Sequence, residues 1–480
     1  MNLALDNYLK SSIKQHEELD YNKFINFRPL VQLVERSSPY QRIGKVFASR
    51  GGVIEVTLPR AIIGSSVEFI TSSGERCLGE VIGLKNDRCI VMPYVEIPGI
   101  NSETLVCLRD MLSTIKVSSG MLGRVLDYQG NPIDDGGAIE DIFETRSIFG
   151  KQINPLQRTA IRMALDVGIK SINAFTTIGK GQRVGIMAGS GVGKSVLLGM
   201  IARNTSADVN VIALVGERGR EVLEFINSDL GPEGLKRSVV VVATSEMSPL
   251  IRVRAAYTAM TIAEYFRDKK NDVLMMMDSI TRFAMANREM AISGGEPPGH
   301  RGYSPSVFAK MPKLLERAGT KEGAGSITGI FTVLVEGDDM DEPVADCVRS
   351  IADGHIVLSR ELAMKNHFPA VDVLASISRV MDKVTTKEHK LIAGHLRDLM
   401  ASYKSAEDLI NVGAYVKGTN AKVDKAMIIY EELMSCLRQA IEESSTIESV
   451  LEQMIEIARA AELATRPKEE KTTREFYADL

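Results

Sequence analysis

The stretch RVGIMAGSGVGKSVLLGM, residues 183–200, most strongly limits how this chain can fold. Its apolar residues before position 189 are typical of a buried strand, and those after position 195 are typical of a helix. Gly189, Gly191 and Gly193 stand between the two runs, and a glycine-rich backbone turns tightly enough for successive N–H groups to point inward. The pattern therefore predicts a strand, an anion-binding loop and the beginning of a helix.

This arrangement is typical of a site for nucleotide phosphates. A helix N-terminus carries roughly half a unit of positive charge and free N–H donors, which suit a phosphate group. We expect Lys194 to reach the β- and γ-phosphates of ATP and the Ser195 hydroxyl to bind Mg²⁺. The residues expected to contact the nucleotide here are Gly189, Ser190, Gly191, Val192, Gly193, Lys194, Ser195 and Val196.

One position departs from the usual phosphate-loop pattern. Ala188 stands six residues before the lysine, where a glycine is usual. The three inner glycines preserve the expected turn. The alternative is an ordinary glycine turn with a surface lysine, and it leaves the preceding strand, the following helix and the adjacent Lys-Ser pair unexplained.

Patterns along the 480 residues predict four parts. Residues 1–20 place apolar residues four apart, which predicts an amphipathic helix that either folds back on its own domain or docks on another protein. Residues 21–97 contain short apolar runs separated by turns, so a small β-barrel or sandwich is expected. Residues 98–380 alternate strands with helices, which indicates an α/β domain with a mostly parallel sheet. Residues 381–480 show only helical periodicity, so a helical C-terminal domain is expected.

The strongest element predictions are short apolar runs. In the N-terminal part the expected strands are 43–48, 53–58, 66–70 and 89–94. In the α/β part the expected strands are 209–215, 239–243, 273–277, 327–335 and 355–358, and the expected helices include 254–267 and 279–291. Two C-terminal helices are expected to begin near residues 423 and 447.

Composition narrows the class of protein. The 58 Lys and Arg residues against 62 Asp and Glu residues give a net charge of −4, so the chain has no overall attraction for nucleic acid, and no nucleic-acid partner is expected. The five cysteines lack metal-binding spacing and are expected to be reduced thiols. No apolar run approaches the ~18 to 20 residues of a membrane helix. A cytoplasmic protein that reaches a membrane only through partners is expected.

Two carboxylates follow predicted strands at the edge of the sheet where ligands bind. Asp278 closes the run 273–277, where it is expected to hold the hydration shell of Mg²⁺, or alternatively to cap the next helix. Glu217 follows the run 209–215, where it can orient the attacking water. The alternative for Glu217 is a salt bridge to Arg218 or Arg220, worth about 0 to 1 kcal/mol if exposed. The residues alone leave both alternatives for Glu217 open.

The motifs together resemble a known family. GERGRE, AGSGVGKS, MMMDSITRFA and the stretches 302–319 and 325–360 are similar to the type III secretion ATPases, which are relatives of the catalytic subunit of rotary ATP synthases. The sequence VLVEGDDMDEP is more similar to the flagellar export ATPase than to the injectisome ATPase. The resemblance implies a small N-terminal β-barrel, a central RecA-like P-loop ATPase domain and a helical C-terminal domain. It also implies Mg²⁺-dependent ATP hydrolysis by a homohexamer that energises or primes flagellar protein export.

The resemblance assigns roles to single residues. It makes Glu217 and Lys194 catalytic, Asp278 the metal-site aspartate, and Arg218 a contact of the nucleotide. Arg379 in SISRV corresponds to an arginine finger that a neighbouring subunit donates, whereas Arg360 in LSRE is expected to be structural. Phe368 in HFPAVD corresponds to the aromatic residue that stacks on adenine, although a core phenylalanine is the plainer alternative. Besides Ala188, the chain departs from the family at Asn173, where aspartate is usual, and at Ser304, where proline is usual and where a more mobile loop is expected.

The same resemblance implies partners. A stator-like regulator is expected at the helix within residues 1–20, and a stalk protein at the acidic loop 336–342. An export gate at the membrane, export chaperones and their substrates complete the set. The rival functions are an injectisome ATPase, a rotary ATP synthase subunit, a hexameric RNA helicase and a nucleotide-sensing scaffold that does not hydrolyse ATP.

Overall fold

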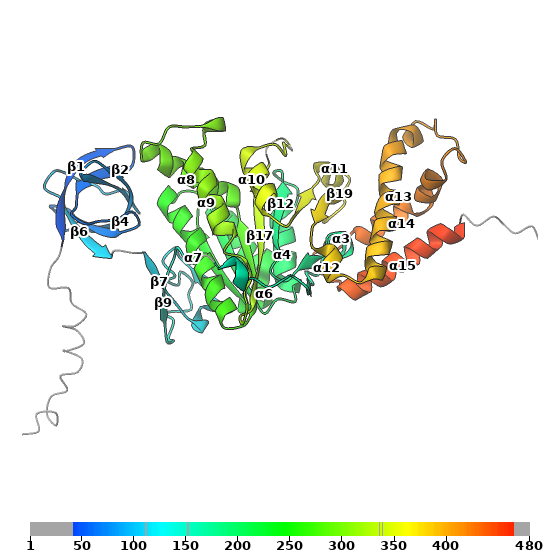
Figure 1. Ribbon diagram of the computed structural model, residues 1–480, viewed down its shortest axis with the longest axis horizontal. Helices are drawn as coiled ribbons and strands as arrows, with labels where there is room; N and C mark the ends of the chain where they lie inside the picture. Colours follow the sequence, from blue (N-terminus) through cyan, green and yellow to red (C-terminus); the bar gives the residue numbers. More distant parts are fainter. Residues whose placement is uncertain (1–41, 111–112, 151–152, 336, 338, 465–480) are drawn as a thin grey trace, which may run out of the picture.

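The computed structural model describes residues 42–464 except 111–112, 151–152, 336 and 338. Figure 1 shows three parts side by side along the long axis: a small barrel, a central sheet covered by helices, and a helical C-terminal part. The fold class predicted from the sequence is confirmed. The expected helix within residues 1–20 lies outside the described residues. No helix in the described part of the chain has the length and apolar character needed to cross a membrane.

The N-terminal part is a closed barrel of six strands in the order β1-β2-β5-β4-β3-β6. Alternate side chains point inward, and Val56, Val67 and Phe69 are fully buried there. All four predicted strands are present. The strands are β1 (Ile43–Arg50), β2 (Val53–Thr57), β3 (Ser66–Ile70), β4 (Arg76–Lys85), β5 (Arg88–Pro93) and β6 (Leu105–Asp110).

The barrel extends past the boundary expected at residue 97, so that boundary is too early. Strand β6 pairs with both β1 and β3 and closes the barrel. The sequence gives β6 only a short apolar run that turns charged at Arg109, and β4 is interrupted by Gly79 and Gly83. Both strands are specified by their pairing in the closed barrel more than by their own periodicity.

The central sheet runs β19-β18-β12-β17-β15-β13-β14-β8. Neighbours from β18 to β8 are parallel, and β19 is an antiparallel edge strand. Every residue of the two strands after the P-loop helix is buried, as a sheet covered on both faces requires. The strands are β8 (Val125–Leu126), β12 (Arg183–Ala188), β13 (Val209–Val215), β14 (Ser238–Ala243), β15 (Asp272–Asp278), β17 (Ser326–Leu334), β18 (Gly354–Leu358) and β19 (Val371–Ser378).

Helices cover the two faces with separate apolar cores. On one face α7, α8, α9 and α10 pack against residues such as Val211 and Met275, and on the other α4 packs against their neighbours Ile212 and Leu274. The alternation along each strand assigns successive side chains to opposite faces. The helices are α4 (Lys194–Asn204), α7 (Pro249–Asp268), α8 (Ile280–Ser293), α9 (Pro305–Leu315) and α10 (Pro343–Ile351).

The C-terminal part consists of α13 (Lys387–Asn411), α14 (Ala421–Leu437) and α15 (Ile447–Ala464). The two helices expected near residues 423 and 447 are confirmed. The apolar core of this part continues into the central part through α3 (Lys170–Phe175) and β19, since Phe175 and Val373 belong to the same cluster. The helical part is therefore packed directly on the α/β part.

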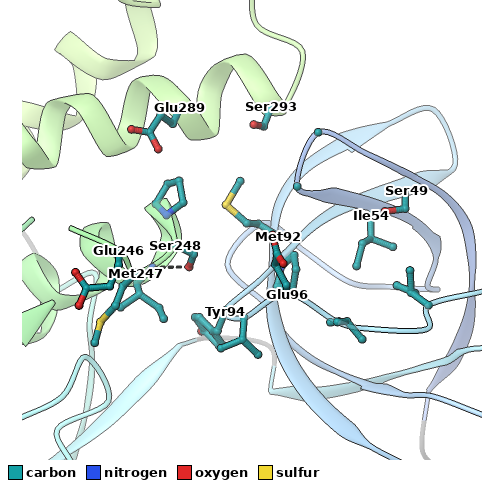
Figure 2. A pocket seen from close by; sticks show the side chains of 18 of the residues that line it. Ser49, Ile54, Met92, Tyr94, Glu96, Glu246, Met247, Ser248, Glu289 and Ser293 are labelled. Atoms are coloured by element: carbon teal, nitrogen blue, oxygen red, sulfur yellow. Dashed lines mark hydrogen bonds between the residues drawn. The ribbon is translucent and has the colours of Figure 1, made fainter. Parts of the chain in front are cut away.

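A buried ion pair joins the barrel to the central part. Arg254 on α7 lies 3.1 Å from the carboxylate of Glu80 on β4 and 3.0 Å from the hydroxyl of Tyr94. A cavity of about 1130 Å³ lies beside this joint. Figure 2 shows Met92 and Glu96 on its barrel side and Glu246 and Glu289 on the side of the central part. Its lining comes from the barrel–core joint and not from the phosphate loop.

Candidate active site

The phosphate loop has the geometry that the sequence predicts. Strand β12 ends at Ala188, and α4 begins at Lys194. Gly191 and Gly193 have φ values of 78° and 88°, in the left-handed region that favours glycine. Val192 is 2% exposed and anchors the loop in the core beneath it, while Ser190, Gly191 and Ser195 are exposed. The loop thus presents backbone and a hydroxyl to solvent at a helix N-terminus.

Parallel strands bring Lys194, Glu217 and Asp278 together. The carboxyl ends of β12, β13 and β15 meet at one edge of the sheet. There Lys194 Nζ donates a hydrogen bond to Asp278 Oδ1 and lies 3.4 Å from Glu217 Oε1. The basic group and both carboxylates that the sequence singled out therefore share one polar cluster.

The contacts of Glu217 bear on the alternative left open from the sequence. Its carboxylate pairs with Lys194. The exposed guanidinium of Arg218 lies 3.3 Å from Glu221 on the next turn. Glu217 thus lies in the phosphate-loop cluster, and within the described part of the chain it forms no salt bridge with Arg218 or Arg220. The contact of Arg218 with a nucleotide remains a prediction.

Burial and charge shift the pKa values in this cluster. Burial raises the pKa of Glu217, and the negative charge of Asp278 adds to this effect while Lys194 opposes it. Burial alone would lower the pKa of Lys194, but the charges of Asp278 and Glu217 outweigh it and raise that pKa. A carboxylate whose pKa is raised towards neutral pH accepts a proton more readily, as a general base must.

Asp278 is held by a threonine that the sequence analysis missed. It is the last residue of β15 and is 3% exposed. Thr332 on the adjacent strand β17 donates a hydrogen bond of 2.7 Å to Asp278 Oδ1. The helix-capping role falls to Ser279, whose hydroxyl accepts from the Arg282 N–H at 3.3 Å. The available signal for Thr332 was that the apolar stretch ITGIFTVLV contains two threonines, Thr328 and Thr332, of which Thr332 is nearer the carboxyl end of the strand.

Phe368 lies against the phosphate loop. A Cβ atom built on Gly193 would lie 3.6 Å from two atoms of the Phe368 ring. The ring is 41% exposed, so one side of it is open, unlike a plain core phenylalanine. The fold therefore places an aromatic face beside the loop that is expected to bind phosphates.

Arg379 lies at the end of the sheet strands that is opposite to the phosphate loop. It follows β19, whose Ser378 pairs with Gly354 at the beginning of β18, and its N–H donates to the Asp353 carbonyl at 2.9 Å. The other end of β18 pairs with Ala188 at the phosphate loop. The strand between the two ends is about 13 Å long. Arg379 is therefore not part of the cluster in its own chain, whereas Arg360 begins α11 (Arg360–Met364) at the phosphate-loop edge.

The residues present fit a nucleoside triphosphate and its metal ion. A Cβ on Gly191 would meet no atom within 4 Å, so the loop faces open space, and the helix N-terminus lies beside it. The positive charge of Lys194 can bind phosphate oxygens in place of the carboxylates of Asp278 and Glu217. The carboxylate of Asp278 and the hydroxyl of Ser195 are oxygen ligands of the type that Mg²⁺ prefers.

The remaining departures from the family have local explanations. The buried Asn173 amide donates to Asp166 Oδ1 at 2.8 Å and to the Ser445 carbonyl at 3.0 Å, and an aspartate carboxylate could not donate either bond. The Ser304 hydroxyl donates to the Pro297 carbonyl at 3.2 Å and so links the two ends of its loop.

The acidic loop is described only in part, since Glu336 and Asp338 lie outside the described residues. Within the described part, Asp339 pairs with Arg301 at 3.2 Å. Asp341 lies 3.7 Å from Arg349 and its side chain is 90% exposed. A contact of this loop with a stalk protein remains a prediction.

Comparison with known proteins agrees with this site. Residues 168–378 match the nucleotide-binding domain of the ATP synthase alpha/beta family, and residues 385–456 match the T3SS EscN ATPase C-terminal domain. The flagellum-specific ATP synthase of Bacillus subtilis is 49% identical over 87% of this chain and 96% of its own length. The type 3 secretion system ATPase of Xanthomonas euvesicatoria is 45% identical over 86% of this chain and 93% of its own length.

A solved structure extends the agreement to the whole described fold. The assembled ATPase EscN of the type III secretion system of enteropathogenic E. coli superposes with a TM-score of 0.82 at 42% identity, covering 86% of this chain and 99% of that chain. A second structure shows EscN in complex with its central stalk EscO, with a TM-score of 0.80 over the same shares. The family resemblance found in the sequence motifs is confirmed. The chain belongs to the flagellar and type III secretion ATPases of the ATP synthase alpha/beta family.

Proposed function

We propose that this ATPase works as a ring of six identical chains that hydrolyse Mg²⁺-bound ATP and thereby energise or prime the export of flagellar proteins. One observation carries the ring: Lys194, Glu217 and Asp278 meet at one edge of the sheet, while Arg379 lies at the other. An arginine side chain spans only about half of that strand length. Arg379 can therefore serve an active site only if the site belongs to a neighbouring chain.

In the proposed mechanism the loop amides and Lys194 hold the phosphates. When phosphates bind, Lys194 exchanges the carboxylates of Asp278 and Glu217 for phosphate oxygens. Glu217 is then free to orient the attacking water and accept its proton. Mg²⁺, held near Ser195 and Asp278, would neutralise charge on the β- and γ-phosphates when bound. Arg379 from the neighbouring chain stabilises the charge of the transition state, and such fingers contribute about 10³ to 10⁵ in rate.

The base end of ATP is assigned to Phe368. The partly exposed ring of Phe368 lies beside Gly193. Arg218, which is also proposed to contact the nucleotide, lies on the exposed surface near Glu221. Stacking on a flat ring contributes about 1 to 3 kcal/mol per base. Stacking on the Phe368 ring therefore contributes affinity for the base but little recognition of its polar groups.

The cellular role follows from the relatives. The flagellum-specific ATP synthases of Bacillus subtilis and Salmonella typhimurium are 49% and 46% identical to this chain. The proposed partners are a stator-like regulator at residues 1–20, a stalk protein in the ring, an export gate, and export chaperones with their substrates. The ring then works in the cytoplasm, at the inner membrane, through these partners. EscN in complex with its stalk EscO supports the stalk partner.

Two measurements test the proposed function. Purified chain should release phosphate from ATP in the presence of Mg²⁺, and native mass spectrometry with a non-hydrolysable ATP analogue should detect six copies. A cell that lacks its own flagellar export ATPase should regain flagellin secretion with this chain and not with Glu217→Gln. Hydrolysis without restored secretion would contradict the flagellar role and leave the injectisome role, for which a virulence-effector secretion assay is the matching test.

A further inference from the structure

Gln439 connects the C-terminal helical part to the segment that carries Phe368. It lies just after α14, in the connection to α15, and is 6% exposed. Its backbone N–H donates a hydrogen bond of 3.0 Å to the carbonyl of Phe368. The helical part thus directly contacts the main chain of Phe368, the residue proposed to stack on adenine.

Both polar atoms of the Gln439 side chain have hydrogen-bond partners. Its Oε1 accepts from the Lys170 N–H at 2.9 Å, and its Nε2 donates to the Gly168 carbonyl at 2.7 Å and to the Glu443 carbonyl at 2.8 Å. A primary amide offers one acceptor oxygen and two donor hydrogens, and each has a partner here. A carboxylate of the same shape could not donate to either carbonyl.

These bonds fix three segments around one buried amide. The segments are the entry to the nucleotide-binding part at Gly168 and Lys170, the chain at Phe368, and the α14–α15 connection. The ion pair between Lys170 and Glu443, at 2.5 Å, bridges the first and third segments as well. The side-chain bonds hold the Gln439 backbone in place, and that backbone holds the Phe368 carbonyl.

The Phe368 ring in turn lies beside Gly193, one residue before Lys194. A displacement of Gln439 would therefore move the base end of the nucleotide site without touching the amides and the lysine that bind phosphates. Substitution of Gln439 should therefore change affinity for the base without changing affinity for the phosphates, and these two affinities can be measured separately.

We infer that Gln439 is a positioning residue for the base end of the nucleotide, which couples the placement of the α14–α15 connection to affinity for adenine. The inference rests on the proposed contact between Phe368 and adenine. Movement of the helical part during the catalytic cycle then changes how tightly the base is held, while the phosphate contacts persist.

The test compares Gln439→Glu, which keeps the shape and removes the donor, with Gln439→Met, which keeps the length and removes all side-chain hydrogen bonds. Gln453→Glu is the matched control, because Gln453 lies on α15 in the same helical part and accepts from Cys436 Sγ at 3.1 Å. Each variant is measured for KM and kcat with ATP, for displacement of a fluorescent ADP analogue, and for inhibition by inorganic tripolyphosphate, which has no base.

Both Gln439 variants should raise the KM for ATP and weaken the ADP analogue by about tenfold, as expected when buried polar groups lose their partners. The inhibition constant of tripolyphosphate and kcat should stay within about twofold, and Gln453→Glu should leave all four quantities unchanged. Unchanged ATP affinity would overturn the inference. An equal loss for ATP and tripolyphosphate would also overturn it, because Gln439 would then support the whole domain and not the base end.

Phe368→Ala separates this inference from the proposed function. If Phe368→Ala leaves the KM for ATP unchanged, the adenine contact itself is wrong. If Phe368→Ala raises the KM and the Gln439 variants do not, the contact stands and only the positioning role is wrong. In the double variant Phe368→Ala with Gln439→Glu, the two effects should be less than additive, since both act on one ring.

Discussion

The ammonium of Lys194 lies 3.4 Å from the Oε1 atom of Glu217, so the group proposed to bind phosphate contacts the group proposed to activate water. The same ammonium also contacts Asp278. Phosphates that draw Lys194 away leave Glu217 with one positive neighbour fewer. In the proposed mechanism, binding of the substrate and readiness of the base are therefore linked through one lysine.

Glu217→Gln should lower kcat by at least about 100-fold, because a positioned base contributes about 10² to 10⁴ in rate. Nucleotide binding should persist, since an amide in place of the carboxylate leaves the phosphate loop intact. Phosphate release and titration of a fluorescent ATP analogue measure the two quantities. Turnover near that of the unaltered chain would show that another group acts on the water.

The raised pKa of Glu217 predicts the acidic side of the pH profile. The carboxylate must be ionised to accept a proton, so kcat/KM should fall as pH drops through the Glu217 pKa. Burial raises that pKa, and the midpoint should therefore lie above the ordinary value of 4.5. A midpoint at or below 4.5, measured from initial rates over a series of buffers, would contradict this account of the cluster.

Thr332→Val should weaken the binding of Mg²⁺. Valine keeps the volume of the fully buried threonine but removes the hydroxyl that holds Asp278 at 2.7 Å. Loss of a hydrogen bond to a charged group costs about 1.5 to 3 kcal/mol, so the Mg²⁺ concentration for half-maximal activity should rise by about tenfold.

Thr328→Val is the matched control for Thr332→Val. Thr328 lies on the same strand, is equally buried, and accepts from the Gly181 N–H at 2.8 Å, away from Asp278. Its Mg²⁺ dependence should equal that of the unaltered chain. Equal shifts in both variants would mean that the strand, and not the contact with Asp278, sets the Mg²⁺ requirement.

His367 should make the fold sensitive to acid. Burial, with the positive charge of Arg438, lowers its pKa from 6.5 to about 4. Between pH 6.5 and about pH 4, the unfolded chain therefore binds a proton at His367 that the folded chain does not bind. Over this range the free energy of unfolding falls by about 1.4 kcal/mol per pH unit as the pH is lowered. The stabilisation is present above pH 6.5 and lost towards pH 4.

Urea midpoints at pH 7.5 and pH 5 measure this effect. His367→Gln should show a smaller drop between the two pH values than the unaltered chain, because glutamine does not titrate. The exposed His300→Gln serves as the control and should retain the full drop. An unchanged drop in His367→Gln would show that other groups cause the acid sensitivity.

The sequence predicted the strongly patterned parts of the fold and less of what depends on pairing. The strand 209–215 was placed to the residue because six of its seven residues are apolar, and all seven are buried in the structure. Strands β4 and β6 were not found, because glycine and charge interrupt their patterns and the closed barrel alone specifies them. The domain boundary at residue 97 was wrong for the same reason.

The site followed the same division. Glu217 and Asp278 were found because each follows an apolar run, and Lys194 because it follows a glycine loop after another such run; parallel strands bring these ends together. Thr332 and Gln439 were missed, because most of their partners are distant in the sequence. Phe368 was placed through the resemblance alone, and its contact with Gly193 is a property of the folded chain.

The central claim is that Arg379 of one chain completes the site of the next, and complementation between two defective variants tests it most directly. Arg379→Ala keeps its phosphate loop but offers no finger, and Lys194→Ala offers a finger but has no working loop. Each should be nearly inactive alone, whereas an equimolar mixture should recover about a quarter of the activity of the unaltered chain, the share of sites with both parts in a random ring. A mixture as inactive as its components, or full activity of Arg379→Ala by itself, would contradict the account.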